Sequence, residues 1–309
     1  MTPADTLSLA SGTGPAPARA SQEVGITRIS RQDGVSAVQA TVLSEAVTLE
    51  EPLEIQLAYG PSQNRLMRSI SVTMRTPGHD DELALGFLHT EGVLGDKVDL
   101  EDLQIAPPET VETDCGPGSR TTAGIVRLAV APGVEVRTAS LERNFYTTSS
   151  CGVCGKASLA ALRSVAPPRR ANTLAVTAAT LFALPGRMLA HQRTFRSTGG
   201  LHAAALFDTE GELHLLREDI GRHNAVDKLV GASFLADNLP LRHRILLLSG
   251  RASFELLQKA VMAGLQVVAA IGAPSSLAIQ VARDFDVTLI GFLRDDHFNI
   301  YNGAERIQA

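Results

Sequence analysis

The sequence predicts a two-lobed α/β protein, α+β overall, with a smaller β-rich N-terminal lobe and a C-terminal lobe of alternating strands and helices. Three observations lead to this prediction. With 309 residues, of which 44% are hydrophobic, the chain can bury a substantial core. Between Ser36 and Thr76, polar and apolar residues alternate as they do in half-buried strands. After Asn144, short aliphatic runs alternate with segments of helical periodicity.

The N-terminal lobe is predicted to span residues 25–143, after a disordered tail. Residues 1–24 are small, aperiodic and rich in Pro and Gly, so they could not bury enough surface to offset their ordering entropy. A helix is expected from Asp80 or Asp81, either of which can cap it, to a stop at Gly92, with the charges up to Glu82 solvated. Strands are expected at Leu53–Leu57, Ile70–Met74, Leu103–Ala106 and Ile125–Val130.

The C-terminal lobe is predicted to span residues 144–309, with a mobile Cys-x-x-Cys loop near its start. Its aliphatic runs, short enough for buried strands, are Ala203–Phe207, Ile245–Leu248, Val267–Ile271 and Val287–Phe292. Its helical stretches, each bounded by Gly or by Ser and Pro, are Arg222–Val230, Phe254–Ala263 and Ser276–Arg283. This order of strands and helices is typical of an α/β layer structure.

Charge and cysteine content argue against several classes of function. The formal net charge is −5 and the pI is near 5.9, so broad nucleic-acid binding is not expected. No apolar run approaches the roughly 18 residues that a membrane span needs. Three cysteines cannot all pair, and no secretory leader is recognisable, so we expect free thiols and a cytoplasmic protein.

The loop Cys151–Cys154 carries two thiols immediately before a helix-like run that begins at Ala157. A helix N-terminus favours the thiolate and lowers a thiol pKa, and Lys156 could add to this effect. Gly152 and Gly155 remove side chains from around the sulfurs, which leaves room for in-line attack. The loop is therefore suited to reactive sulfur chemistry.

Other roles for this Cys-x-x-Cys pair stay open, and on spacing alone metal binding or redox exchange ranks ahead of sulfur transfer. Zinc needs more ligands, but Cys115 lies in a separate loop, and His202 or His223 would complete a set only at an uncommon spacing. A redox pair is expected directly after a strand, whereas a Thr/Ser-rich loop precedes this one. Two inert buried cysteines are disfavoured, because Ser, Thr and Gly offer little apolar packing.

A second cluster, Glu218–Lys228, lies where a strand-like run ends and a helix begins. In α/β sheets, ligands bind beyond the carboxyl ends of strands, and the first turn of a helix offers backbone donors to phosphate. Arg222 and His223 fall in that turn, where an anion site and an ordinary capped helix are about equally favoured. For Asp227 and Lys228 we expect the simpler role of solvated residues on the outer helix face.

Three further segments are predicted at strand ends. Ser249-Gly250-Arg251 combines a hydroxyl, a flexible backbone and a guanidinium suited to phosphate, although Ser253 could simply cap the next helix. His202 follows a Gly pair that would expose it, which slightly favours a functional role over a structural one. Phe292–His297 ends the last aliphatic strand, where Arg294 and His297 could meet anionic oxygen, unless the segment is only a charged turn.

Four motifs occur together in one order: Ser-Cys-Gly-Val-Cys-Gly, Thr-Gly-Gly-Leu-His-Ala-Ala, Glu-Asp-Ile-Gly-Arg-His-Asn-Ala-Val-Asp-Lys and Ser-Gly-Arg-Ala-Ser-Phe-Glu. On these motifs the chain resembles the formate dehydrogenase accessory (FdhD/NarQ) sulfurtransferases, from roughly Leu49 to the C-terminus. The stretch from Met74 to Gly92 is similar to the N-terminal lobe of that family.

The resemblance implies that a cysteine desulfurase loads a persulfide, and that sulfur then passes to the molybdenum bis(molybdopterin guanine dinucleotide) cofactor before it enters formate dehydrogenase. Cys151 would be the persulfide carrier and Cys154 its partner. The cofactor-contacting run of the family falls on Phe292, Leu293, Arg294, Asp295, Asp296 and His297. The predicted strand-end positions, rather than the resemblance, add His202, Arg222, His223 and Arg251 as further candidates for binding this cofactor. A homodimer without a structural metal is implied.

The resemblance also implies a cytidine-deaminase-like fold for the C-terminal lobe, which raises the possibility of a zinc deaminase. Deaminases need a His-x-Glu or Cys-x-Glu element together with Pro-Cys-x-x-Cys, and neither accompanies Cys151. Deamination is rejected on that ground. The alternative that remains is a non-catalytic chaperone that holds the molybdenum cofactor for formate dehydrogenase, since the motifs around Arg222, Arg251 and Arg294 would serve either role.

Overall fold

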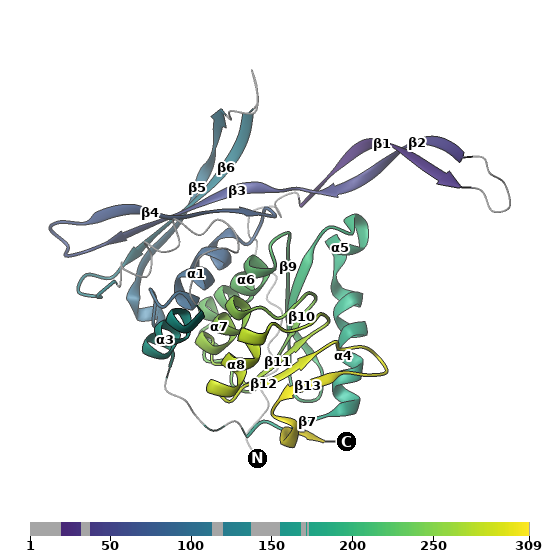
Figure 1. The fold of residues 1–309 in the computed structure, drawn as a ribbon. Helices are drawn as coiled ribbons and strands as arrows, with labels where there is room; N and C mark the ends of the chain where they lie inside the picture. Colours follow the sequence, from purple (N-terminus) through teal and green to yellow (C-terminus); the bar gives the residue numbers. More distant parts are fainter. Residues whose placement is uncertain are drawn as a thin grey trace, which may run out of the picture.

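The computed structural model describes residues 20–31, 38–112, 120–136, 155–167, 171 and 173–308. Within these ranges the chain forms a four-stranded sheet, a six-stranded sheet, a long hairpin and a short two-stranded sheet, with helices packed on the two larger sheets (Figure 1). None of the described helices combines the length and apolar character needed to cross a membrane. The mixed α/β class predicted from the sequence is confirmed.

The four-stranded sheet contains β3 (Glu51–Tyr59), β4 (Leu66–Arg75), β5 (Leu100–Glu112) and β6 (Arg120–Val130). The strand order is β4-β3-β6-β5, with β3 and β6 parallel and the other pairs antiparallel. Leu53, Ile55 and Leu57 alternate with polar residues and are buried, as predicted, in a core that includes α1 (Asp80–Thr90). A short 3-10 turn, η1 (Lys97–Asp99), leads into β5.

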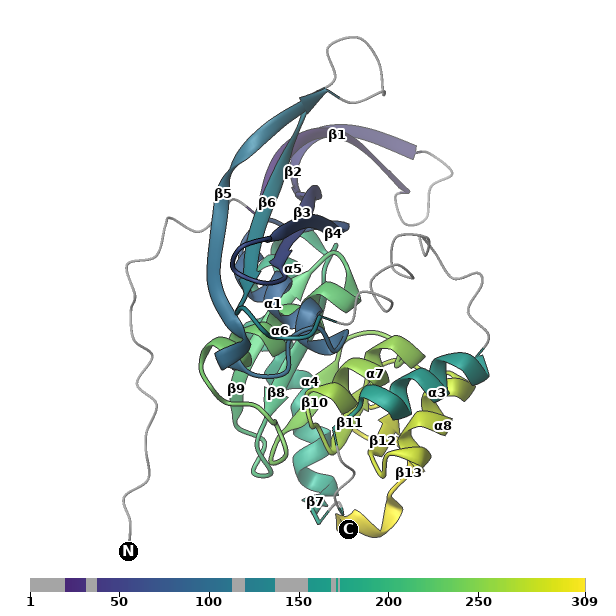
Figure 2. The same cartoon turned by 90° about the vertical axis from the view of Figure 1, so that its left-hand side faces the viewer.

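An antiparallel hairpin of β1 (Ser21–Arg31) and β2 (Val38–Thr48) precedes this sheet. It extends away from the body of the molecule and is mostly exposed (Figures 1 and 2). Near its base, the Thr48 hydroxyl donates to the Thr198 hydroxyl at 2.9 Å. Because β1 begins at Ser21, the prediction of a tail up to residue 24 is wrong for its last four residues.

The six-stranded sheet has the order β13-β12-β11-β10-β8-β9. Its strands are β8 (His202–Phe207), β9 (Leu213–Asp219), β10 (Ile245–Leu248), β11 (Val267–Ala270), β12 (Thr288–Gly291) and β13 (Asn299–Asn302). Strands β10, β11 and β12 are parallel, while β8, β9 and β13 run antiparallel to their neighbours. The aliphatic runs predicted as strands all occur here.

Helices cover both faces of this sheet. Alternate strand residues such as Leu246 and Leu248 pack with α6 (Arg222–Leu235), α7 (Phe254–Met262), α8 (Ser276–Asp284) and α3 (Gly155–Val165). The intervening residues, such as Ile245 and Leu247, pack against α4 (Ala178–His191). The short helix α5 (Arg193–Thr198) follows α4, and β7 (Val176–Thr177) pairs with β14 (Ile307–Gln308), which follows the 3-10 turn η2 (Ala304–Arg306).

Helices α1 and α6 join the two large sheets at very close range. A Cβ atom at Gly86 would lie 1.8 Å from the carbonyl oxygen of Asp227, and one at Gly231 would lie 1.8 Å from that of Glu82. Each helix therefore places a glycine against the backbone of the other, at a distance that no side chain permits. The sheets are held together by direct helix contact.

Several expectations about helix ends and charges are wrong. The N-cap of α1 is His79 in a left-handed conformation, because the Asp80 carboxylate pairs with Arg75 at 2.9 Å instead of capping. Glu82 is not solvated: it is buried and accepts a hydrogen bond at 2.7 Å from Arg217 on β9. Ser253 is the N-cap of α7, but its side chain makes no capping hydrogen bond.

Candidate functional site

Five chain segments lie together at one edge of the six-stranded sheet. Strands β10, β11 and β12 are parallel, so their carboxyl ends meet there. Antiparallel β8 begins at the same edge, and His202 pairs with Asp219, the last residue of β9. We call this surface the carboxyl edge; it comprises residues 199–202, 219–223, 249–251, 271–272 and 292–297. The sequence predictions at four strand ends thus fall on one continuous surface.

Backbone hydrogen bonds connect the loops of the carboxyl edge. The Gly272 amide donates to the Gly250 carbonyl at 2.9 Å, and the Phe292 amide donates to the Gly272 carbonyl at 3.1 Å. A Cβ at Gly272 would lie 2.9 Å from the backbone nitrogen of Arg251, so only glycine fits there. Beside it, the His202 ring lies over Gly250. The close contact fixes the backbone from which Arg251 extends.

The segment after β12 begins with one exposed and one buried side chain. Phe292 is 39% exposed and adopts a left-handed conformation with φ 53°, whereas the Leu293 side chain is fully buried in the core under α4. The Leu293 side chain belongs to that core, so a contact between Leu293 and the cofactor would have to use its backbone. The guanidinium of Arg294 donates to the carbonyls of Ile271 and Leu293 at 2.7 and 2.8 Å, which ties it to the edge.

The remaining residues of this segment are exposed. The His297 ring pairs with the Asp296 carboxylate at 2.6 Å, and Asp295 precedes them. The guanidinium of Arg251 is also exposed and bonds to no residue in the described part of the chain. Two cations at this end of the edge could therefore bind an anion. Arg251 has no partner in the described part of the chain, and Arg294 is held in place by backbone oxygens.

The first turn of α6 presents polar atoms that lack partners. Its N-cap, Gly221, provides no side-chain cap, and both Arg222 Nε and His223 Nε2 are buried without a hydrogen bond to any described residue. The nearest carboxylate to His223 is that of Glu255, at 3.9 Å. Buried donors without partners are uncommon, and the amide groups of an uncapped helix start favour anions. This turn fits an anionic ligand.

Electrostatics at the carboxyl edge keep both imidazoles neutral at pH 7. Burial, followed by the positive charges of Lys259 and Arg222, lowers the pKa of His223 to about 4. Burial and Arg222 also lower the pKa of His202, against an opposing effect of Asp219. Neutral imidazoles can each donate one proton and accept another, so they suit hydrogen bonding to a bound ligand.

A buried polar network supports the α6 turn from below. Asp219 is fully buried, lies 2.7 Å from Lys228 Nζ, and accepts hydrogen bonds from the Gly221 amide and the Asn224 side chain at 2.8 and 3.0 Å. Lys228 also donates to the carbonyl of Thr76, the residue after β4, at 2.8 Å. The position of the first turn of α6, which carries Arg222, therefore depends on the buried charges of Asp219 and Lys228.

The expectation that Asp227 and Lys228 are solvated is wrong. Their exposed fractions are 2% and 1%, because α6 lies between the sheet and α1 and has no outer face at these positions. Asp227 accepts a hydrogen bond from Thr90 and pairs with Lys259, both at 2.9 Å. Burial raises the pKa of Asp227 despite this pairing.

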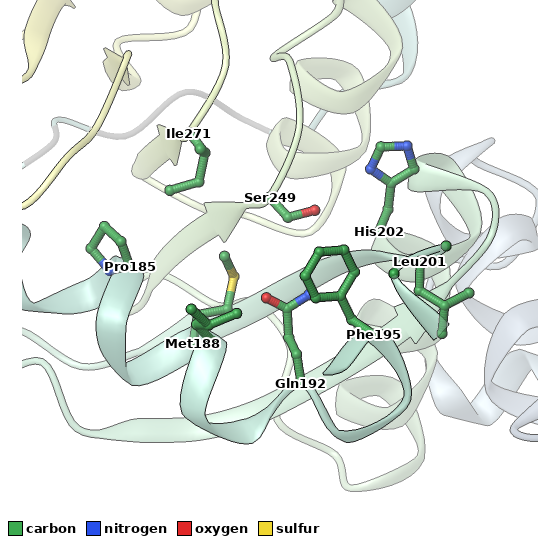
Figure 3. A pocket seen from close by; sticks show the side chains of 11 residues that line it. Pro185, Met188, Gln192, Phe195, Leu201, His202, Ser249 and Ile271 are labelled. Atoms are coloured by element: carbon green, nitrogen blue, oxygen red, sulfur yellow. The ribbon is translucent and has the colours of Figure 1, made fainter. Parts of the chain in front are cut away.

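A pocket of about 500 Å³ lies on the α4 side of the carboxyl edge (Figure 3). It is bordered by α4, α5, the turn before β8 and the ends of β10 and β11. Most of the lining is apolar or aromatic, with Gln192, His202 and Ser249 as polar members. The complete lining is Pro185, Met188, Leu189, Gln192, Phe195, Gly199, Gly200, Leu201, His202, Ser249 and Ile271.

The family of the chain follows from comparison with known proteins. A model described as the FdhD/NarQ family matches residues 49–308, which is most of the chain and includes every strand of both large sheets. The chain belongs to the FdhD/NarQ family.

Curated relatives extend this match. The protein named "Sulfur carrier protein FdhD" of Mycolicibacterium paratuberculosis is 47% identical over 283 residues, covering 91% of this chain and 99% of that protein. The protein of the same name from Streptomyces coelicolor is 51% identical over 265 residues, covering 85% and 89%.

A solved structure shares the fold. The crystal structure of a formate dehydrogenase accessory protein from Desulfotalea psychrophila superimposes with a TM-score of 0.62 at 20% sequence identity. The match covers 92% of this chain and 99% of that protein. At this identity the likeness supports the fold and carries no detail of the site.

The two cysteines of the FdhD/NarQ motif, Cys151 and Cys154, lie outside the described residues, as does Cys115. Helix α3 begins at Gly155, the residue after Cys154, which agrees with a helix directly following the motif. Leu159 and Leu162 bury α3 against the core that contains α7 and α8, and Arg163 pairs with Asp284 at 2.6 Å. Within the described ranges, no cluster of three or more His, Cys, Asp or Glu side chains could hold a metal.

Sequence reasoning missed the residues that α4 and α5 contribute to the pocket of this family member. Gln192 and Phe195 lie in a stretch where Pro185 and Gly186 interrupt the helical pattern, so neither helix was predicted. The Gly199-Gly200 pair was noted only for exposing His202. A useful signal was available, since Leu181, Leu184 and Met188 recur at helical spacing and are all buried.

Proposed function

We propose that this chain is a cytoplasmic sulfurtransferase that carries sulfur as a persulfide on Cys151 and passes it to a molybdenum bis(molybdopterin guanine dinucleotide) cofactor used by formate dehydrogenase. The observation that carries this proposal is the carboxyl edge. There Arg222, Arg251 and Arg294 meet two neutral imidazoles beside an uncapped helix N-terminus. Relatives with about half of their residues identical are named sulfur carriers.

The sulfur-loading step requires a thiolate. Cys151 lies four residues before Gly155, where α3 begins, and the partial positive charge of a helix N-terminus favours a thiolate. The Cys151 thiolate would attack the outer sulfur of a persulfide on a cysteine desulfurase. A new sulfur–sulfur bond forms, the old one breaks, and the desulfurase cysteine leaves as its thiolate. Cys154 would act as a partner that relays the sulfur or resolves the persulfide.

The delivery step has the cofactor as substrate. In our proposal its phosphate groups bind to the first turn of α6 and to Arg251 and Arg294, because Arg222 Nε and His223 Nε2 are buried without a hydrogen bond in the described structure and the two other guanidinium groups form no ion pair there. As the substrate, a reduced molybdenum centre would supply the electron pair for the bond to the outer persulfide sulfur, so that the metal is oxidised by two electrons and the sulfur is reduced to the sulfide level. The sulfur–sulfur bond would break, Cys151 would leave as its thiolate, and the persulfide proton would pass to solvent. The formate dehydrogenase catalytic subunit would receive the cofactor.

Mass spectrometry tests the carrier role. After incubation of the full chain with a cysteine desulfurase and cysteine, we expect a mass increase of one sulfur on Cys151. The Cys151→Ala variant should lack the adduct, and Cys115→Ala, which removes a cysteine outside the motif, should keep it. No adduct on the unmodified protein, together with retained cofactor binding, would instead establish the non-catalytic chaperone.

The metal alternative has its own measurement. The zinc content of protein purified without chelator is measured and compared with that of the Cys154→Ala variant purified in the same way. The sulfur-carrier proposal predicts substoichiometric zinc in both samples. Stoichiometric zinc that is lost in the variant would overturn it, because zinc-bound thiolates would not be available as carriers.

A further inference from the structure

Two adjacent carboxylates at the end of β9, those of Glu218 and Asp219, hold the starts of two different helices. Successive side chains of a strand alternate between the two faces of a sheet. Asp219 accepts a hydrogen bond from the Gly221 amide at the start of α6, at 2.8 Å. Glu218 accepts hydrogen bonds from the Thr194 and Phe195 amides at the start of α5, at 3.0 and 2.8 Å. Each carboxylate therefore anchors one helix start.

Glu218 takes the place of a missing N-cap of α5. The residue before this helix is Gln192, and its side chain makes no capping hydrogen bond. An N-cap side chain normally accepts from the amides of the second or third helical residue, which in α5 are Thr194 and Phe195. One oxygen of Glu218 accepts from each of them, and a negative charge is favourable at a helix N-terminus. A strand residue thus caps a helix to which it does not belong.

Helix α5 depends on this anchor more than the longer helices would. It has six residues, none of them fully buried, and a helix of this length is not stable by itself. At its other end, Thr198 accepts a hydrogen bond from Thr48 of the hairpin at 2.9 Å, and the chain turns at Gly199 with φ 68°. The position of α5 is therefore set by contacts at its two ends, of which the Glu218 cap is one.

A shift of α5 would change one wall of the pocket and not the other. Phe195, whose amide Glu218 holds, lines the pocket, and α5 leads directly into residues 199–202 of the carboxyl edge. Ser249 and Ile271 lie across the pocket from Phe195 and follow β10 and β11, which are central strands of the sheet (Figure 3). Glu218 therefore controls the separation between a weakly supported wall and a rigid one.

We propose that Glu218 is a positioning residue for cofactor binding, which holds α5 at the distance from the carboxyl edge that the bound cofactor requires. Asp219 has the corresponding role for the first turn of α6. The proposal rests on the proposed function, because it takes the cofactor to contact both α5 and the α6 turn. Glu218 itself does not touch the ligand, since backbone amides occupy both of its oxygens.

Calorimetric titration of the full chain tests this role, with GDP and inorganic diphosphate as separate probes. In our proposal GDP is long enough to contact both helices, whereas diphosphate contacts only the α6 turn and the arginines. Glu218→Ala should weaken GDP binding about fivefold to tenfold, the range that corresponds to the loss of one helix cap, and should leave diphosphate binding unchanged. Glu218→Gln keeps an oxygen that can accept from an amide, so it should recover part of the GDP affinity. Glu210→Ala, which removes an exposed carboxylate before β9, should alter neither.

Hydrogen exchange shows whether the cap itself is lost. The Thr194 and Phe195 amides should exchange about tenfold faster in Glu218→Ala, while the Gly221 amide keeps its rate. The inference is overturned if GDP and diphosphate weaken by the same factor, if GDP affinity is unchanged despite faster exchange, or if Glu218→Gln binds GDP no better than Glu218→Ala.

Failure of the proposed function gives a different result. If the unmodified chain binds neither probe, the proposed cofactor site is wrong, and the role of Glu218 fails with it. If the unmodified chain binds both probes and Glu218→Ala behaves identically, only the role of Glu218 fails. The sulfur adduct on Cys151 should form in Glu218→Ala as in the unmodified chain, so the carrier role is tested separately.

Discussion

Asp219 and Lys228 form a buried ion pair: the exposed fraction of the side chain is 0% for Asp219 and 2% for Lys228. Asp219→Asn would leave the Lys228 ammonium buried without its counter-charge. We expect the free energy of unfolding to fall by about 3–5 kcal/mol, measured by denaturant titration, because an uncompensated buried charge is strongly unfavourable. Binding of diphosphate to the carboxyl edge should weaken as well, since Asp219 positions the turn that carries Arg222.

Two further variants separate charge from packing. Asp219→Asn combined with Lys228→Met removes both charges and should regain much of the lost stability. Glu45→Gln breaks the exposed pair with Arg28, at 3.6 Å, and should cost less than about 1 kcal/mol. Equal losses for the buried and exposed pairs would refute the role assigned to Asp219.

His223 gives the stability of the protein a pH dependence with a definite sign. Its pKa is lowered from 6.5 to about 4, so between these values the unfolded chain binds a proton that the folded chain does not. The free energy of unfolding should therefore fall as pH decreases from 6.5 to 4. With 36% of the side chain exposed, solvent screening reduces the effect to on the order of 1–2 kcal/mol.

The His223→Gln variant should show a smaller fall over the same pH range in denaturant titrations. His243→Gln, a change at an exposed histidine before β10, should behave like the unmodified protein. An identical pH slope for His223→Gln and the unmodified chain would contradict the lowered pKa.

At the scale of elements, the crossing of α1 and α6 depends on the absence of two side chains. Gly86→Ala would place a methyl group 1.8 Å from the Asp227 carbonyl oxygen, which the backbone of α6 cannot accommodate without moving. We expect a loss of about 3 kcal/mol or more in the free energy of unfolding. The thermal midpoint should drop accordingly.

Gly186→Ala is the matched control, since Gly186 lies within α4 and a Cβ there would meet nothing within 4 Å. This change should raise the free energy of unfolding by about 0.4–1 kcal/mol, because it restricts the unfolded chain without straining the helix. If both alanine variants behave alike, the close approach of α1 and α6 is not a determinant of stability.

The elements that could be predicted from the sequence are those with a strong local pattern. Ile245–Leu248 is a continuous aliphatic run, and β10 has these bounds because both faces of the strand are covered by helices. The hairpin of β1 and β2 was missed in part because it is exposed on both faces, so its residues need not alternate. Helix α4 was missed because Pro185 lies inside it.

For the whole molecule, the carboxyl edge could be predicted because parallel strands bring their ends to one place whatever the details of packing. The pocket could not be predicted, since Gln192 and Phe195 line it only because α4 and α5 pack beside β8 and β10. Asp227 and Lys228 were misassigned for a related reason: two charged neighbours on a helix usually face water, and only the tertiary contact with α1 buries them.

The glycine contact between α1 and α6 also limits how the molecule can move. The two large sheets could close over a substrate only about a hinge between them, and the place where such a hinge would lie is filled by touching backbones and buried ion pairs. Small-angle scattering should therefore give the same radius of gyration with and without GDP. A decrease of several per cent in the radius of gyration would instead show that the two sheets close on each other. Sulfur delivery, if it requires motion, would then have to use parts of the chain other than this joint.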